Sequence, residues 1–194
     1  MTTPSNTFEH PNADDRIRAV HVRTSGATME RRADGTFIIR GDEPLEAYPR
    51  VIEVRHASWN NQGILGYFSE KGVSFCNIDQ PLLGRAIAPT THATAPIGYV
   101  RLHGRNYEQW FEHEAPHDRY NYLYSEGELA RWKPRIEEIA QKTDVTFVIA
   151  NNHFEGKAAV NGLQLKYMLT GRKVKAPETL VERYPELREI SEIG

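Results

Sequence analysis

The sequence predicts an α/β protein with a parallel sheet, and three observations lead to this class. Four short runs rich in β-branched and aromatic residues follow one another from residue 49 onward. Most of these runs are separated by longer stretches with apolar residues at helical spacing. Polar side chains gather where each run ends. This order is typical of β/α units, in which each strand is followed by a crossing segment that returns the chain to the same edge.

The first expected elements occupy the middle of the chain. A strand over residues 51–55 precedes a helix over about 60–71, which Gly72 is placed to end. A second strand is expected over 73–79. A loop rich in Pro, Thr and Ala then leads to a third strand over 99–103.

The second half continues the alternation. Ser125, followed by Glu128 three residues later, forms a capping-box sequence that predicts the start of a helix. A fourth strand is expected over 145–150 and a final long helix over about 156–169, before a tail with a short surface helix. One stripe of the capped helix carries its apolar residues, which are Leu129, Trp132, Ile136 and Ile139.

Residues 1–43 differ in kind from the rest. Their short apolar runs and an Asp34-Gly35 turn sequence are typical of a β-hairpin and not of β/α units. We expect this segment to be an appendage of two or three short strands.

Composition narrows the class of protein. The 194 residues are 39% hydrophobic and 26% charged, and the net charge is −2. Because this charge is small, no global field favours nucleic acid or an anionic membrane. No run approaches the roughly 20 apolar residues of a membrane span. The single cysteine, Cys76, lies in an apolar run and is expected to be a small buried hydrophobe. These features predict a cytoplasmic chain with no membrane partner.

The strand ends predict one polar site. Side chains alternate along a strand, and Glu53 with Arg55, Asn77 with Asp79, and Arg101 with His103 each form a polar row opposite an apolar row. We expect the apolar rows to face helices and the polar rows to face one another on the other side of the sheet. The fourth strand contributes the residues that follow it, Asn151, Asn152 and His153. Such a network either neutralises itself as a structural element or leaves charge available for a ligand.

Five separated strings carry a family resemblance. EVRHASW, GVSFCNIDQP, YVRLHGRN, RYNYLYS and NNHFEGKAAVNGLQLK together resemble domain of unknown function 72 (DUF72), the YecE-like proteins, from about Leu45 to Leu187. The resemblance implies a partial (β/α)8 TIM barrel of about four C-terminal units, and no established activity. Residues 1–43 have no counterpart in it, which divides the chain into a non-matching segment, 1–43, and a C-terminal half-barrel, 44–194.

Half a barrel leaves strand edges and an inner face uncovered. We therefore expect a C-terminal fragment that self-associates or needs a complementary N-terminal half-barrel chain.

The first functional hypothesis is a phosphate-bearing ligand, either a nucleotide or nucleic acid. Cationic side chains would meet its charge, amides and tyrosines would position it, and the start of the last helix would add a positive dipole end. The expected ligand-binding residues are Arg55, Arg101, Arg105, Asn106, Tyr122, Asn151, Asn152 and Lys157.

Two alternatives remain open. Metal-assisted phosphodiester hydrolysis is suggested by carboxylates and histidines at strand ends, although no HxH or HExxH spacing occurs and the arginines in the same rows would repel a cation. No residue is therefore assigned to a metal, and the sequence leaves any cofactor unknown. The third hypothesis is a non-catalytic assembly protein or an inactive remnant. If a reaction occurs, the expected catalytic residues are Glu53, Asp79, His103 and His153.

Overall fold

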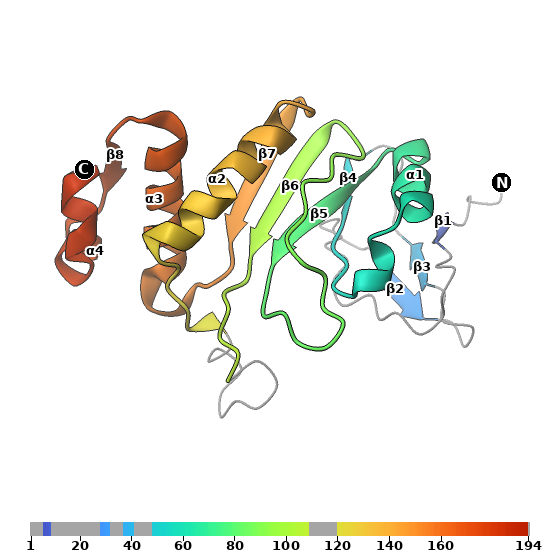
Figure 1. The fold of residues 1–194 in the computed structure, drawn as a ribbon, viewed down its shortest axis with the longest axis horizontal. Helices are drawn as coiled ribbons and strands as arrows, with labels where there is room; N and C mark the ends of the chain where they lie inside the picture. Colours follow the sequence, from blue (N-terminus) through green and yellow to red (C-terminus); the bar gives the residue numbers. More distant parts are fainter. Residues whose placement is uncertain (1–5, 9–27, 32–36, 41–47, 109–119, 194) are drawn as a thin grey trace.

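The structure is a computed structural model that describes residues 6–8, 28–31, 37–40, 48–108 and 120–193 (Figure 1). Its centre is a four-stranded parallel sheet in the order β4-β5-β6-β7. The predicted α/β class with a parallel sheet is confirmed. The sheet consists of β4 (Arg50–Ile52), β5 (Val73–Asp79), β6 (Ile97–Leu102) and β7 (Val145–Ala150).

Helix α1 (Gln62–Glu70) joins β4 to β5. The Asn61 side chain caps it by accepting a hydrogen bond from the backbone N–H of Ile64. Gly72 ends the helix with a φ of 61°. Ile64 and Phe68 are buried in one apolar cluster with Phe75 of β5. The helix therefore lies close to the predicted range and covers the first half of the sheet.

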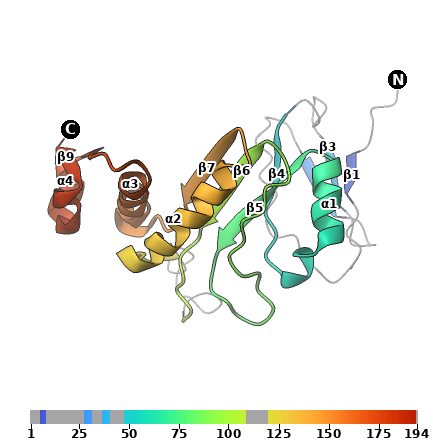
Figure 2. The same cartoon turned by 45° about the horizontal axis from the view of Figure 1, so that its top comes forward.

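Helix α2 (Glu126–Ala140) carries the predicted capping box. The Ser125 hydroxyl accepts from the backbone N–H of Glu128, whose carboxylate accepts from the backbone N–H of Ser125. Both α1 and α2 lie on one side of the sheet (Figures 1 and 2). All members of the predicted stripe are buried, and they pack against Val100 and Leu102 of β6: Leu129, Trp132, Ile136 and Ile139.

Burial of the strands changes across the sheet. Every residue of β5 is buried, whereas β6 buries alternate residues and β7 exposes alternate residues. The β6–β7 register places Tyr99 beside Phe147 and Arg101 beside Ile149. We call this side, which lies opposite α1 and α2, the inner face. On β7 it carries three exposed apolar side chains, Val145, Phe147 and Ile149.

The register of β5 corrects one prediction. Cys76 pairs with Tyr99 and Ile78 with Arg101, so these apolar residues lie on the inner face. Asn77 and Asp79 consequently face the helices, and the prediction that their polar row joins the rows of Glu53 and Arg101 is wrong. Both faces of β5 are buried, so its alternation did not indicate which row faces the helices.

Hydrogen bonds compensate the burial of those two polar side chains. The Asn77 amide donates to the carbonyl oxygen of His92 at 2.8 Å, and its Oδ1 accepts from the Thr90 hydroxyl at 2.7 Å. Asp79 Oδ2 accepts from Trp132 Nε1 at 3.0 Å. Nearly all buried polar groups in folded proteins are paired in this way.

A separate antiparallel sheet precedes the β/α units. Its order is β1-β3-β2, formed by β1 (Asn6–Phe8), β2 (Thr28–Arg31) and β3 (Phe37–Arg40). Strands β2 and β3 are antiparallel neighbours, as expected for the predicted hairpin. The predicted turn at Asp34-Gly35 lies outside the described residues.

The last elements follow helix α3 (Lys157–Thr170). Strand β8 (Val174–Ala176) pairs in parallel with β9 (Ser191–Ile193), and α4 (Glu178–Arg183) is the short helix predicted in the tail. Within the described ranges, no helix is both long and apolar enough to cross a membrane.

Candidate functional site

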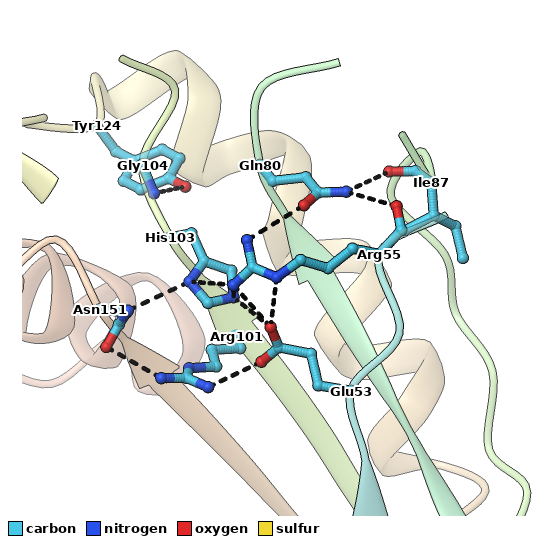
Figure 3. A network of polar contacts seen from close by, with 9 residues as sticks. All are labelled: Glu53, Arg55, Gln80, Ile87, Arg101, His103, Gly104, Tyr124 and Asn151. Atoms are coloured by element: carbon cyan, nitrogen blue, oxygen red, sulfur yellow. Dashed lines mark hydrogen bonds and ion pairs between the residues drawn. The ribbon is translucent and has the colours of Figure 1, made fainter. Parts of the chain in front are cut away.

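The carboxyl ends of three strands bring five polar side chains together on the inner face. Glu53 and Arg55 follow β4, Arg101 and His103 lie at the end of β6, and Asn151 follows β7 (Figure 3). We call these five residues the inner cluster. Each was predicted as a site residue, and their assembly follows from the parallel order of the strands.

Glu53 is the centre of the inner cluster, and its side chain is only 3% exposed. Its Oε2 accepts from Arg101 Nη1 at 2.8 Å. Its Oε1 lies 2.8 Å from Arg55 Nη2 and 3.0 Å from His103 Nε2. One buried carboxylate is therefore the shared partner of two guanidinium groups and one imidazole.

The contacts of Arg101, Asn151 and Glu53 with one another and with His103 form one consistent set of hydrogen bonds. A guanidinium only donates. Arg101 Nη2 lies 3.2 Å from Asn151 Oδ1 and so fixes that oxygen as an acceptor. The Asn151 amide nitrogen then donates to His103 Nδ1 at 3.2 Å, which leaves the imidazole proton on Nε2, facing Glu53. Arg55 Nη2 also lies 3.0 Å from His103 Nε2, and it lies 2.8 Å from Glu53 Oε1. Because the ionised Glu53 carboxylate only accepts, its contact with Nε2 favours a neutral His103 with its proton on Nε2, and Arg55 then donates to Glu53.

Burial and charge act in opposite directions on the two titratable members. Burial alone would raise the pKa of Glu53, but the hydrogen bond from His103 and the nearby positive charges outweigh it and lower that pKa to about 2. Burial lowers the pKa of His103, and the arginine charges add to this effect against the opposing influence of Glu53. Both directions agree with an ionised Glu53 beside a neutral His103.

The inner cluster presents two guanidinium groups near its solvent edge. Its five residues contain two guanidinium groups, one carboxylate and a neutral imidazole. The Arg55 and Arg101 side chains are 20% and 13% exposed, so both reach the solvent edge of the cluster. An anion at this edge would meet two guanidinium groups whose positions are already fixed.

A second group of polar residues lies between the sheet and α2, and we call it the helix-side cluster. Arg105 Nε contacts both carboxylate oxygens of Asp79 at 3.0 and 3.1 Å, and its Nη1 lies 3.2 Å from Glu128 Oε1. The Tyr122 hydroxyl donates to the same Glu128 oxygen at 2.7 Å. Asp79, Arg105 and Tyr122 were predicted as members of one site with Glu53, but the structure uses them to hold α2 on β5.

The remaining predicted residues lie around the loop before α3. The Asn106 amide donates to the carbonyl oxygen of Asn121 at 3.4 Å, and Lys157 Nζ donates to the Asn121 side chain. His153 is exposed, with Nδ1 at 3.1 Å from the Asn151 carbonyl oxygen and its ring 5.0 Å from that of Tyr120. These contacts do not bring Asn106, Lys157 or His153 into the inner cluster.

Asn152 is fully buried between the loop after β7 and the loop before α2. Its amide donates to the Tyr122 carbonyl oxygen and to Asn161 Oδ1, each at 2.7 Å. Its own Oδ1 has no hydrogen-bond partner among the described residues. Asn161 also bonds both the N–H and the carbonyl of Tyr124, so this pair fixes the loop that carries Tyr122 and Tyr124.

Two residues with a structural part in the site were not predicted. Gln80 accepts from Arg55 Nη1 at 3.4 Å and donates to the Arg55 carbonyl oxygen at 3.1 Å (Figure 3). Its position directly after Asp79, in the same polar strand end, was an available indication. Asn161 lies beside Val160 and Leu165, the buried apolar residues of α3. A polar residue at that position was the available indication of a structural role.

The backbone between β7 and α3 contains one strained residue. Glu155 has a φ of 53°, and among the described residues it is the single non-glycine with a positive φ. Such a conformation costs about 1 kcal/mol for a residue with a Cβ. The Tyr184 hydroxyl donates to the Glu155 carbonyl oxygen at 2.8 Å, which ties this turn to the segment after α4.

Metal ligands do not gather at the strand ends that the structure describes. Across 48–108 and 120–193, no three His, Cys, Asp or Glu side chains are placed to hold one ion. The two carboxylates proposed for metal-assisted chemistry, Glu53 and Asp79, lie on opposite faces of the sheet, and each is bound to arginine.

A parallel sheet with helices on one face and a polar cluster at its carboxyl end defines an α/β protein. The family profile described as "Protein of unknown function DUF72" matches residues 16–184. The chain belongs to the DUF72 family, and the predicted membership is confirmed. The match begins within the segment 1–43 that the five strings leave outside the resemblance.

Relatives and solved structures agree with this assignment. The chain is 30% identical to UPF0759 protein YunF of Bacillus subtilis, over 62% of this chain and 46% of YunF. A crystal structure of a DUF72 family protein from Thermotoga maritima is 38% identical, with a TM-score of 0.59 over 63% of this chain and 46% of that one. A DUF72 protein from Enterococcus faecalis is 29% identical, with a TM-score of 0.56 over 62% of this chain and 47% of that one. The chain thus spans about half the length of these relatives.

Proposed function

We propose that the inner cluster binds a phosphate-bearing ligand. The observation that carries this proposal is the convergence of Arg55 and Arg101 on the single carboxylate of Glu53. Glu53 holds both guanidinium groups at the strand ends, and their fork geometry suits the oxygens of phosphate. The Asn151 amide, which bonds both Arg101 and His103, keeps the arrangement rigid.

The position of the inner cluster supports the same proposal. Ligands of open α/β sheets and barrels bind beyond the carboxyl ends of the strands, which is where these side chains lie. We infer from the family and the strand order that the sheet forms about four units of a (β/α)8 barrel. In that arrangement the inner cluster would occupy part of the barrel rim, and the chain would be a C-terminal part of the longer proteins it resembles.

The proposal concerns binding and assigns no reaction. Of the four predicted catalytic residues, Glu53 and His103 lie together, whereas Asp79 faces α2 and His153 is exposed. Each nitrogen of His103 is already engaged by a hydrogen bond. The hydrolytic alternative therefore has less support from the described residues than ligand binding has. A cytoplasmic location stays a prediction.

Thermal unfolding tests the proposal. Inorganic phosphate, a nucleoside monophosphate and a short oligonucleotide would each be added to the protein, with sodium chloride at matched ionic strength as reference. A ligand that binds the folded state stabilises it by about 2.7 kcal/mol at 100 times its Kd. We expect the melting temperature to rise with at least one of the phosphate-bearing compounds.

Two variants separate site binding from the general effect of phosphate on protein surfaces. Arg101→Gln removes one guanidinium from the inner cluster while Arg55 still pairs with Glu53. Arg172→Gln removes an exposed positive charge just after α3, outside the inner cluster. The phosphate-dependent rise should persist in Arg172→Gln and be lost in Arg101→Gln. An equal rise in both variants would show that phosphate does not bind at the inner cluster.

A further inference from the structure

Strand β7 exposes an apolar row that a parallel sheet ordinarily covers. Its inner-face side chains Val145, Phe147 and Ile149 are 44%, 46% and 38% exposed. The inner-face residues of β5, Cys76 and Ile78, are each 1% exposed. Parallel strands are normally buried on both faces, so the exposed row marks a surface suited to an apolar neighbour.

The sheet also has two different edges. Among the described strands, β7 pairs with β6 alone and β4 pairs with β5 alone. Each edge strand presents backbone N–H and C=O groups on its outer side, and such groups pair with another strand when one is available. One chain therefore carries both a β4 edge and a β7 edge, in the same parallel direction.

The two edges are complementary in a twofold arrangement. Rotation about an axis parallel to the strands brings β7 of one copy beside β4 of its partner, and β4 of the first copy beside the partner's β7, with every strand still parallel. Four strands from each copy give eight. Eight is the number at which the interior of a barrel is just filled by side chains.

We propose that two copies of this chain associate through their β7 and β4 edges and close one eight-stranded parallel barrel. The exposed row of Val145, Phe147 and Ile149 then becomes part of the barrel interior. Both inner clusters lie at the same rim of that barrel, because all strands run in one direction. The closed pairing uses each edge once, so assembly stops at the dimer.

A second copy of this chain is the partner that we assign to the exposed row and the two edges. The solved DUF72 proteins share the fold of this chain over 46% and 47% of their own lengths, so two copies amount to about one such protein. This inference concerns assembly and is independent of the phosphate proposal, which is tested by ligand-dependent melting.

Sedimentation velocity over a wide concentration range tests the proposed dimer. The full chain should sediment as a species of twice its 22.2 kDa mass at high concentration and dissociate on dilution. Phe147→Glu places a charge in the proposed interface and should raise the dissociation constant on the order of a hundredfold. Leu82→Glu is the matched control, because Leu82 is 50% exposed and lies in the loop after β5. Its dissociation constant should stay at that of the unchanged protein.

Hydrogen exchange on the unchanged protein identifies the pairing and does not depend on the folding of any variant. The closed dimer predicts that amides of both β4 and β7 gain protection as concentration rises. Protection of β7 alone would indicate that β7 pairs with β7 of the second copy, and this would overturn the proposal. A monomer at all concentrations, or open-ended assemblies larger than a dimer, would overturn it as well.

Discussion

The buried carboxylate of Glu53 is the common partner of Arg55, Arg101 and His103. Removing one partner of a buried ion pair leaves the other charges uncompensated, and this costs several kcal/mol. We expect Glu53→Gln to lower the free energy of unfolding by about 3 kcal/mol, measured by urea denaturation at neutral pH.

An exposed pair provides the control for that substitution. Glu70 and Lys71 form an ion pair at 2.7 Å with side chains 69% and 48% exposed. Exposed pairs contribute less than about 1 kcal/mol, so Glu70→Gln should change stability by less than that amount. Similar losses in the two variants would contradict a central role for Glu53.

The Asn151 amide faces Nδ1 of His103 at 3.2 Å and favours a proton on Nε2. In Asn151→Asp, a carboxylate oxygen would face His103 Nδ1 and favour a proton there, which should raise the pKa of the imidazole. In Asn151→Ala no such charge is present, and the pKa of His103 should stay below its ordinary value. NMR titration of the imidazole nitrogens measures both effects. A protonated Nδ1 in the unchanged protein at neutral pH would contradict the assigned direction of the hydrogen bonds.

Strand β6 and helix α2 pack closely at Gly98. A Cβ added at Gly98 would lie 2.6 Å from Ile139 Cγ2 of α2 and 2.6 Å from Thr146 Oγ1 of β7. Contacts this short force the packed elements apart, so Gly98→Ala should lower the free energy of unfolding by about 1–3 kcal/mol. Gly66 in α1 has nothing within 4 Å of an added methyl group. Gly66→Ala should therefore raise the free energy of unfolding by about 0.5–1 kcal/mol. Chemical denaturation of the two variants should give changes of opposite sign.

Several elements were predictable because local and tertiary preferences agree. The ranges of β5 and β7 match the predicted 73–79 and 145–150, since β-branched runs between helical patterns leave little choice. The start of α2 follows from the hydrogen bonds between Ser125 and Glu128. Strand β4 ends at Ile52, three residues before the predicted end, and of the predicted residues beyond it only Glu53 keeps a single bridge.

At the scale of the whole molecule, the stability should depend on pH through Glu53. Its pKa in the folded state, about 2, lies below the ordinary value of 4.5. A lowered carboxylate pKa stabilises the fold above about pH 5, and this contribution is lost as the pH falls toward 2. The expected loss is about 3 kcal/mol.

The comparison with Glu53→Gln isolates this contribution from other acidic groups. The difference in unfolding free energy between the unchanged protein and Glu53→Gln should shrink steadily between pH 5 and pH 2. Urea denaturation at several pH values measures it. A difference that stays constant over this range would show that the carboxylate titrates alike in the folded and unfolded chains.

The site was predictable only in part, for a reason that lies in the whole sheet. Strand order alone places Glu53, Arg101 and Asn151 at one end, so the inner cluster follows from the sequence. The sequence does not indicate which row of a doubly buried strand faces the helices, and this choice assigned Asp79 to the helix-side cluster. The direction of the hydrogen bonds at His103 requires distances, which no sequence pattern contains.

The left-handed turn at Glu155 couples the rim of the sheet to the end of the chain. Its carbonyl is held by Tyr184, and it follows closely on Asn151 and Asn152. The docking of the last segment and the geometry of the loop after β7 are therefore thermodynamically linked. Linkage is reciprocal, so any compound that favours one loop geometry tightens or loosens the contact at Tyr184 by the same free energy. If a compound binds at the rim as proposed, the C-terminal segment would then report on it without contacting it.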